Sequence, residues 1–128
     1  MRILIMGGAG MIGQKLLNLL LQKKELKNQK ISEITLFDII EAPYAENSSI
    51  TIITKSGDIS DPQVSKDLIS SEPDVIFHLA AIVSGQAEQE FDLGWNINTK
   101  GSWGLFEAIR SQRNDYVPRV VFTSSIAV

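Results

Sequence analysis

Three glycines spaced three residues apart lie close to the N-terminus in the stretch GGAGMIG: Gly7, Gly10 and Gly13. Gly8, Gly10 and Gly13 also satisfy the spacing G-x-G-x-x-G. In such a pattern one glycine permits a tight turn after a strand, a second lets the backbone approach a pyrophosphate, and the third lets the helix pack closely on the sheet. The pattern therefore predicts a phosphate-binding turn, followed by a helix whose first residues, Met11 and Ile12, face the phosphates. The alternative is a turn in which the glycines are only structural.

An acidic residue, Asp38, stands at the end of the next strand-like segment. A carboxylate at this place can accept hydrogen bonds from both hydroxyls of an adenosine ribose, and it would repel a 2'-phosphate. The residues that follow, Ile39, Ile40 and Glu41, include no arginine or lysine that could neutralise such a phosphate. The pattern therefore favours NAD over NADP as the cofactor. The alternative is an aspartate that caps a loop.

The elements that must position these residues can be read from the pattern of apolar residues. Strands are predicted at residues 2–6, 34–37, 50–54, 74–78 and directly after Pro118. Helices are predicted from Met11 onwards, from Asp61-Pro62 to about Ser70, and over roughly residues 88–113. Strands that alternate with helices in this way predict an α/β fold with parallel strands and right-handed crossovers. We expect a Rossmann-type doubly wound sheet, with residues 1–128 as one NAD-binding domain that stops after the fifth strand.

Composition excludes several other classes of protein. Charged residues make up 21%, hydrophobic residues 44%, and the formal net charge is −3, which argues for a folded domain and against a nucleic-acid partner. There is no cysteine and only one histidine, which excludes disulfides and a cysteine nucleophile and argues against a metal site. The N-terminal apolar run ends at Met6, far short of a membrane span. We expect a soluble cytoplasmic protein that does not bind membranes.

Six motifs run in order along the chain: GGAGMIG, Asp38, GDI at 57–59, HLAA at 78–81, N-x-x-G at 98–101 and FTSS at 122–125. This set resembles the extended short-chain dehydrogenase/reductase family, the nucleoside-sugar epimerases, dehydratases and their relatives. The stretch HLAAIVSGQAEQEFDLGWNIN is similar to members that oxidise a four-carbon sugar acid with NAD. The resemblance implies a full-length NAD-dependent oxidoreductase acting on a sugar acid, or alternatively an epimerase or dehydratase acting on a nucleotide sugar.

The resemblance also assigns further contacts to the cofactor. Asp58 and Ile59 would flank the adenine, although Gly57-Asp58 would serve equally well as a plain turn. Three residues follow the fourth strand, Leu79, Ala80 and Ala81, and small side chains there would let the backbone lie against the nicotinamide ribose. Helix packing, which also favours alanine, is the alternative. Asn98 resembles the family's asparagine that ties down sheet backbone near the cofactor, and a helix-surface asparagine is the alternative.

Two polar side chains lie just beyond the HLAA turn, Ser84 and Gln86. This is the carboxyl edge of the sheet, where open α/β folds bind ligands, so they are candidates for contacts with the substrate's carboxylate or hydroxyls. A polar loop that only caps the next helix is the alternative. His78 ends an apolar strand, and we expect a neutral imidazole hydrogen-bonded in the core rather than an acid or base. Trp95 and Trp103 are expected in the core or an interface.

By resemblance, Ser125 is the catalytic residue that hydrogen-bonds the substrate's reacting oxygen. The family pattern adds a tyrosine about two dozen residues later, with a lysine four residues beyond it. Neither Tyr44 nor Tyr116 is followed by such a lysine. We therefore expect these 128 residues to be the N-terminal part of a longer enzyme and to show no turnover alone.

The resemblance implies a homodimer for the full-length protein, formed in part by the long helix after the fourth strand. For the chain as it stands, we expect an uncovered apolar patch that makes a non-native contact, with Leu93, Trp95, Leu105 or Phe106 contributing to it. Two other functions stay open: a non-catalytic module that senses NAD, and a methyltransferase, against which GDI and FTSS argue. A P-loop NTPase is excluded, because no G-K-[ST] follows the glycines.

Overall fold

The structure is a computed structural model that describes residues 1–44, 49–82, 88–113 and 115–124. Its main sheet has five strands in the order β5-β4-β1-β6-β7, and all four neighbouring pairs are parallel. The strands are β1 (Arg2–Met6), β4 (Glu33–Asp38), β5 (Thr51–Ser56), β6 (Val75–His78) and β7 (Arg119–Phe122). The helical elements are α1 (Met11–Lys23), α2 (Pro62–Ile69), α4 (Phe91–Gly94), the π-helical segment η1 (Trp95–Gly101) and α5 (Ser102–Arg110). The predicted Rossmann-type parallel sheet is confirmed.

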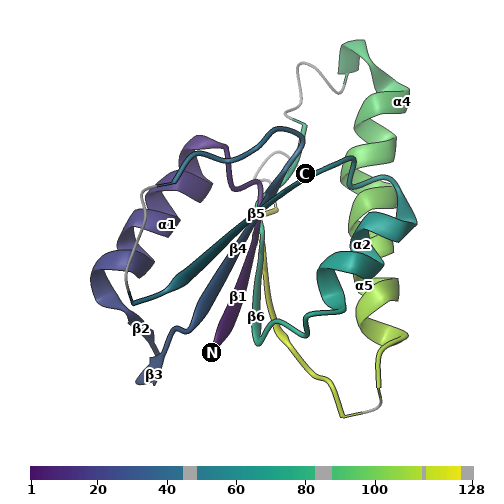
Figure 1. The fold of residues 1–128 in the computed structure, drawn as a ribbon. Coiled ribbons are helices and arrows are strands. Elements are labelled where there is room, and N and C mark those ends of the chain that lie inside the picture. The colour runs from purple at the N-terminus through teal and green to yellow at the C-terminus, as the bar shows by residue number, and fades with distance from the viewer. Residues whose placement is uncertain (45–48, 83–87, 114, 125–128) are drawn as a thin grey trace.

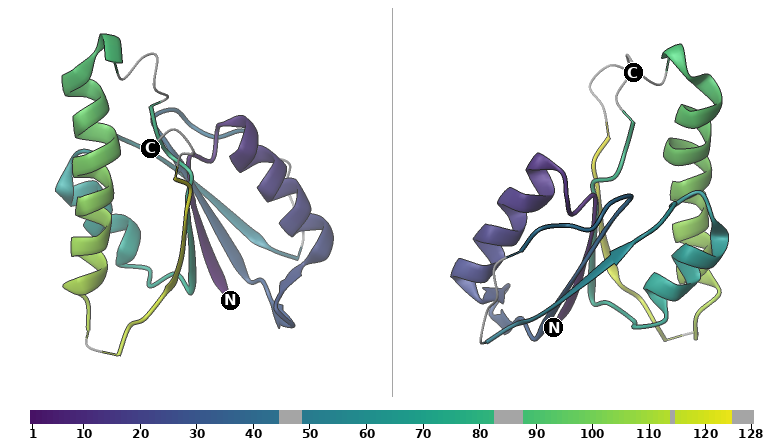
Figure 2. Two further views of the ribbon diagram at one scale, coloured as in Figure 1. Left: turned by 180° about the vertical axis from the view of Figure 1, so that it is seen from behind. Right: turned by 45° about the horizontal axis from the view of Figure 1, so that its top comes forward.

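The helices cover the sheet from both sides. Figure 1 shows α1 on one face, with α2, α4 and α5 on the other, and the two views of Figure 2 agree. The central strand explains this arrangement, because successive side chains of a strand point to opposite faces. Ile3 and Ile5 pack with Leu17 of α1, while Leu4 and Met6 belong to the second core cluster. The second cluster also contains side chains from α2 and α5, including Leu68, Ile69 and Leu105.

The register brings the carboxyl ends of three strands together. Met6 of β1 lies opposite Phe37 of β4 on one side and His78 of β6 on the other. The residues that leave these strands, the glycine loop, Asp38 and Leu79, therefore meet at one edge of the sheet. In an open parallel sheet this edge is where ligands bind, at the point where the strand order reverses.

A small hairpin, β2 (Glu25–Leu26) with β3 (Gln29–Lys30), was not predicted from the sequence. Its turn residues, Lys27 and Asn28, have φ values of 49° and 62°. A two-residue hairpin turn of type I′ needs positive φ at both positions, and glycine is the usual indicator of it. Here a lysine and an asparagine take that conformation, so the hairpin carries no glycine signal in the sequence.

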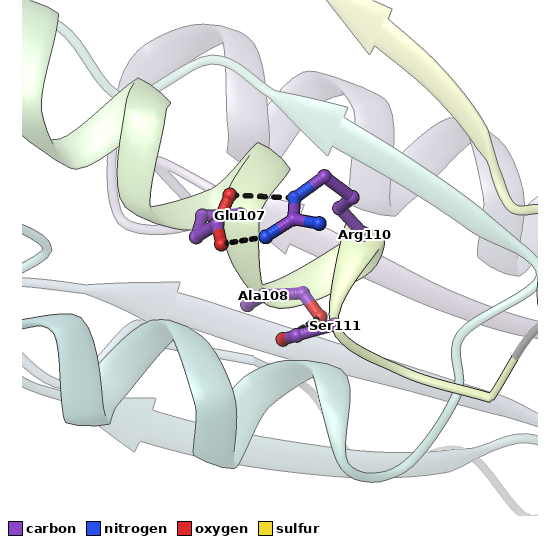
Figure 3. A network of polar contacts seen from close by, with 4 residues as sticks. All are labelled: Glu107, Ala108, Arg110 and Ser111. Atoms are coloured by element: carbon purple, nitrogen blue, oxygen red, sulfur yellow. Dashed lines mark hydrogen bonds and ion pairs between the residues drawn. The ribbon is translucent and has the colours of Figure 1, made fainter.

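The predicted helix over roughly residues 88–113 is interrupted and shorter than expected. It contains the π-helical segment η1, and α5 ends at Arg110. At that end the Ser111 hydroxyl donates to the Ala108 carbonyl at 3.1 Å, which satisfies one of the carbonyls that a helix terminus leaves free. Figure 3 shows this contact beside the paired bonds from the Arg110 guanidinium to the Glu107 carboxylate. Among the described residues, no helix is both long enough and apolar enough to cross a membrane.

Candidate dinucleotide site

The glycine loop is held so closely that side chains cannot fit at two of its positions. Gly7 has a φ of +90°, and a Cβ there would lie 2.9 Å from the Ala80 nitrogen. A Cβ on Gly13 would lie 2.2 Å from the Gly7 carbonyl oxygen. The amides of Gly7 and Gly8 both donate to the Phe37 carbonyl, at 2.8 and 3.0 Å. The turn and the close helix packing predicted for these glycines are therefore present.

Helix α1 presents its N-terminus to the same edge of the sheet. It starts at Met11, and its N-cap Gly10 makes no side-chain cap hydrogen bond. No acidic residue lies in its first turn, which the structure describes in full. The first amides of a helix have no partner within it, and together with the helix dipole they favour an anion. The end of α1 is therefore suited to an anion, and phosphate binding at Met11 and Ile12 stays a prediction.

The Asp38 carboxylate joins the glycine loop to the end of β4. Its Oδ2 accepts from the Ala9 amide at 2.9 Å, and its Oδ1 accepts from the Ile39 amide at 2.7 Å. The side chain is half-buried and borders the cavity described below. In this structure the carboxylate thus caps a loop, which was the alternative to binding a ribose. A carboxylate has about four acceptor sites, so these two bonds leave acceptor capacity for a diol.

Asp58 and Ile59 follow β5 and have different surroundings. The Asp58 Oδ1 accepts from the Ser60 amide at 2.8 Å, so this exposed residue forms the turn considered as its alternative role. Ile59 is only 5% exposed and belongs to the core cluster beneath α5. Both residues border the cavity.

Asn98, on η1, holds the backbone that follows β6. Its Oδ1 accepts from the Ile82 amide at 2.8 Å, and its Nδ2 donates to the Ile82 carbonyl at 3.0 Å. Asn98 itself is not among the residues that line the cavity, whereas Ile82 is. The asparagine therefore fixes the backbone of Ile82, as the sequence predicts, and Ile82 in turn lines the cavity.

These segments surround one cavity of about 640 Å³. Eleven of the twelve predicted cofactor contacts line it, all except Asn98: Gly7, Gly10, Met11, Ile12, Gly13, Asp38, Asp58, Ile59, Leu79, Ala80 and Ala81. Six lining residues were not predicted: Phe37, Ile39, Gly57, Ile82, Leu93 and Ile97. Five of these six are direct sequence neighbours of predicted residues, which is a signal the sequence offers. Leu93 has no such signal, because it reaches the cavity from the helical arm formed by α4, η1 and α5.

The only histidine of the chain, His78, is buried and lies away from the cavity lining. Its Nε2 lies 3.0 Å from the Ser102 hydroxyl, and its ring meets the Phe122 ring edge-on with centroids 5.2 Å apart. Burial lowers the pKa of this imidazole, because desolvation disfavours the charged form. The prediction of a hydrogen-bonded core histidine is confirmed, and the lowered pKa favours its neutral form.

The Tyr116 hydroxyl makes a hydrogen bond to backbone outside the cavity. It donates to the Pro73 carbonyl at 2.8 Å, and neither residue lines the cavity. Burial, together with the nearby charges of Glu72 and Asp74, raises its pKa to about 12. This tyrosine therefore stays protonated near neutral pH, in keeping with its exclusion as the family's proton-transferring tyrosine.

Several sequence predictions are corrected or lie outside the described residues. Trp95 and Trp103 are 50% and 71% exposed, so a place in the core is wrong for both, while the interface alternative stays a prediction. Leu105 is fully buried between α5 and the sheet and cannot contribute to an exposed apolar contact. Ser84, Gln86 and Ser125 lie outside the described residues.

A parallel α/β sheet in which a glycine loop, a helix N-terminus and a carboxylate surround one cavity defines a dinucleotide-binding domain of the Rossmann class. The chain belongs to the NAD dependent epimerase/dehydratase family, whose model matches residues 3–128.

Among curated proteins it is 42% identical to a D-erythronate dehydrogenase of Cupriavidus necator, over all of this chain and 40% of that protein. Among solved structures it is similar to a nucleoside-diphosphate-sugar epimerase of Agrobacterium tumefaciens, with 45% identity and a TM-score of 0.94 over 100% of this chain and 38% of that one. A uronate dehydrogenase variant from the same organism, solved with NAD, is 25% identical with a TM-score of 0.71, over 97% of this chain and 40% of that one. The chain thus spans about two fifths of the length of these relatives.

Proposed function

We propose that the cavity at the carboxyl edge of the sheet binds NAD and that residues 1–128 form the NAD-binding domain of an oxidoreductase. The observation that carries this proposal is the convergence of two complementary groups on one cavity. The N-terminus of α1 offers unpaired amides to a pyrophosphate, and the Asp38 carboxylate offers acceptors to the adjoining ribose.

We propose a position along the cavity for each part of the cofactor. The pyrophosphate lies over Gly10, Met11 and Ile12, and the adenosine extends past Asp38 towards the end of β5, where Asp58 and Ile59 stand. The nicotinamide half extends the other way, towards Leu79, Ala80 and Ala81 after β6. The strand order supports this direction, because β4 and β5 lie on one side of β1 and β6 lies on the other.

For the substrate, we propose a sugar acid such as D-erythronate, whose secondary alcohol is oxidised. The D-erythronate dehydrogenase of Cupriavidus necator, to which this whole chain is 42% identical, supports this choice. A nucleotide sugar is the second candidate, supported by the 45% identity to the nucleoside-diphosphate-sugar epimerase of Agrobacterium tumefaciens. NAD supplies the hydride acceptor, and the protein must add a group that takes the alcohol's proton. We assign the contacts to the reacting substrate to Ser84, Gln86 and Ser125.

We further propose that the 128-residue chain binds the cofactor without turnover, because it lacks a tyrosine followed by lysine four residues later. A non-catalytic NAD-sensing module has the same signature. The full-length protein is proposed to be a cytoplasmic homodimer. The exposed aromatic side chains Phe91, Trp95, Trp103 and Phe106 on the helical arm support self-association.

A titration with NADH, followed by its fluorescence, tests the binding step directly. Saturable binding to the folded chain is expected, with NADPH binding more weakly because its 2'-phosphate would meet the Asp38 carboxylate. Absence of NADH binding by a folded sample would remove the proposal. The substrate is tested with the full-length protein by comparing NADH production from D-erythronate with conversion of a UDP-sugar. D-erythronate oxidation alone supports the dehydrogenase, and UDP-sugar conversion alone supports the epimerase.

A further inference from the structure

Gly101, the last residue of η1, packs against Ile59, a residue of the cavity wall. The residue is buried, and a Cβ at this position would lie 2.9 Å from Cγ2 of Ile59 and 3.3 Å from its Cγ1. Real Cβ atoms do not occur at the shorter of these distances. The helix therefore sits on Ile59 at a separation that only a glycine permits.

Ile59 in turn forms part of the cavity wall. It is 5% exposed, packs in the core cluster with residues such as Phe37 and Leu105, and borders the cavity. Because the core is close-packed, a side chain pushed away from Gly101 has no room on its other buried sides. The free space next to it is the cavity, so any atom added at position 101 would drive Ile59 into the cavity.

The same π-helical segment also contacts the cavity through other residues. Asn98 holds both backbone polar groups of Ile82, and Ile97 lines the cavity itself. π-Helical turns are rare and occur frequently at functional sites. The segment η1 thus reaches the wall next to β5 through Gly101 and the wall after β6 through Asn98.

We propose that Gly101 is a positioning residue that fixes Ile59 in the cavity wall and thereby sets the room for the adenine end of the dinucleotide. This inference rests on the proposed function, which places the adenine next to Ile59. Gly101 does not touch the cofactor and acts only through Ile59.

The test is the substitution Gly101→Ala, with NADH, ADP-ribose and reduced nicotinamide mononucleotide as separate probes. We expect the affinities for NADH and ADP-ribose to fall together by about tenfold or more, the effect of one misplaced methyl-sized group in a fitted pocket. Binding of the mononucleotide, which has no adenine, should be unchanged. If Gly101 had only a structural role, Gly101→Ala would change the affinity for the mononucleotide as much as the affinities for the two probes that contain adenine.

Gly104→Ala is the matched control, because the same substitution three residues later on α5 would place a Cβ 3.5 Å from the Ser65 hydroxyl, an ordinary contact. This variant should bind all probes like the parent chain. Ile59→Ala removes both atoms that crowd position 101, so adding Gly101→Ala to it should change NADH affinity by less than about twofold, unlike the tenfold effect in the parent.

Two results would overturn the inference. One is a folded Gly101→Ala variant with unchanged NADH affinity. The other, if that variant does not fold, is a double variant with Ile59→Ala that also fails to fold or binds NADH more weakly than Ile59→Ala alone. Failure of the parent chain to bind NADH is a different outcome, which removes the proposed function itself.

Discussion

Replacing Asp38 by asparagine tests the electrostatic part of the cofactor site while keeping the size of the side chain. The carboxylate already accepts from the amides of Ala9 and Ile39, at 2.9 and 2.7 Å. Two of its roughly four acceptor sites are therefore left for the two hydroxyls of the ribose. An asparagine has one acceptor oxygen and no charge, so it cannot serve both amides and both hydroxyls. Hydrogen bonds to charged groups contribute about 1.5–3 kcal/mol each.

The expected result is that Asp38→Asn weakens NADH binding by about 1.5–3 kcal/mol, or roughly 10- to 150-fold in the dissociation constant. NADPH should be affected less, because the substitution also removes the charge that repels a 2'-phosphate. Fluorescence titration measures both constants, and a urea unfolding curve confirms that the variant is folded. Glu33→Gln is the matched control, since it removes the same charge from the opposite end of the same strand β4. An Asp38→Asn variant that is folded and binds NADH as tightly as the control would refute this reasoning.

Four further predictions concern the remaining parts of the fold and site. The lowered pKa of His78 means that the unfolded chain takes up a proton more readily than the folded chain. The free energy of unfolding should therefore fall as the pH drops below about 6.5, by up to about 1.4 kcal/mol per pH unit. Urea unfolding at several pH values should show this fall, and His78→Gln should flatten the pH dependence. Gly13→Ala forces a Cβ to 2.2 Å from a backbone oxygen and should lower the free energy of unfolding by about 1–3 kcal/mol or more. In Gly10→Ala the added Cβ would lie 3.4 Å from the Gly7 carbonyl oxygen, an ordinary contact. This variant should leave the free energy of unfolding nearly unchanged in the same measurement but weaken NADH binding. Asn98→Ala removes both bonds to Ile82 and should cost about 1–3 kcal/mol in thermal or urea unfolding, whereas an unchanged curve would show that these bonds are not stabilising.

The order of the elements was predictable because its signals are local. The apolar run at residues 3–6 has no polar face, which indicates a strand covered on both sides, and Ile3 and Leu4 do point into opposite core clusters. Asp61 and Pro62 indicate a helix start, and the Asp61 carboxylate accepts from the Gln63 amide at 2.8 Å. Such signals depend on neighbouring residues alone.

Other features depend on contacts between distant segments and left no local signal. The π-helical segment η1 sits where Asn98 reaches the backbone of Ile82, sixteen residues away in sequence. Trp103 looks like a core residue by its type, yet 71% of it is exposed, because α5 turns Leu105 and Ala108 towards the sheet instead. Which face of a helix is buried follows from the packing partner, and in α5 both aromatic residues, Trp103 and Phe106, are exposed.

The site was predictable for the same reason that the strands were. Residues that directly follow parallel strands meet at one edge, so Asp38 and Leu79 could be placed beside the glycine loop before any contact was known. The two amides that Asp38 binds could not be predicted, because they depend on the exact path of the loop after β1. Likewise, Leu93 joins the cavity only because the helical arm lies beside it.

The central claim is that NAD binds across the glycine loop at the carboxyl edge of the sheet. Amide spectra of the ¹⁵N-labelled chain, recorded with increasing NAD⁺, test this claim residue by residue. The account predicts saturable shifts of the amides from Gly8 to Gly13 and of Ile39, with those of Lys30 and Glu33 at the opposite edge unchanged. Spectra of a folded chain that do not change with NAD⁺, or that change only at the opposite edge, would contradict it.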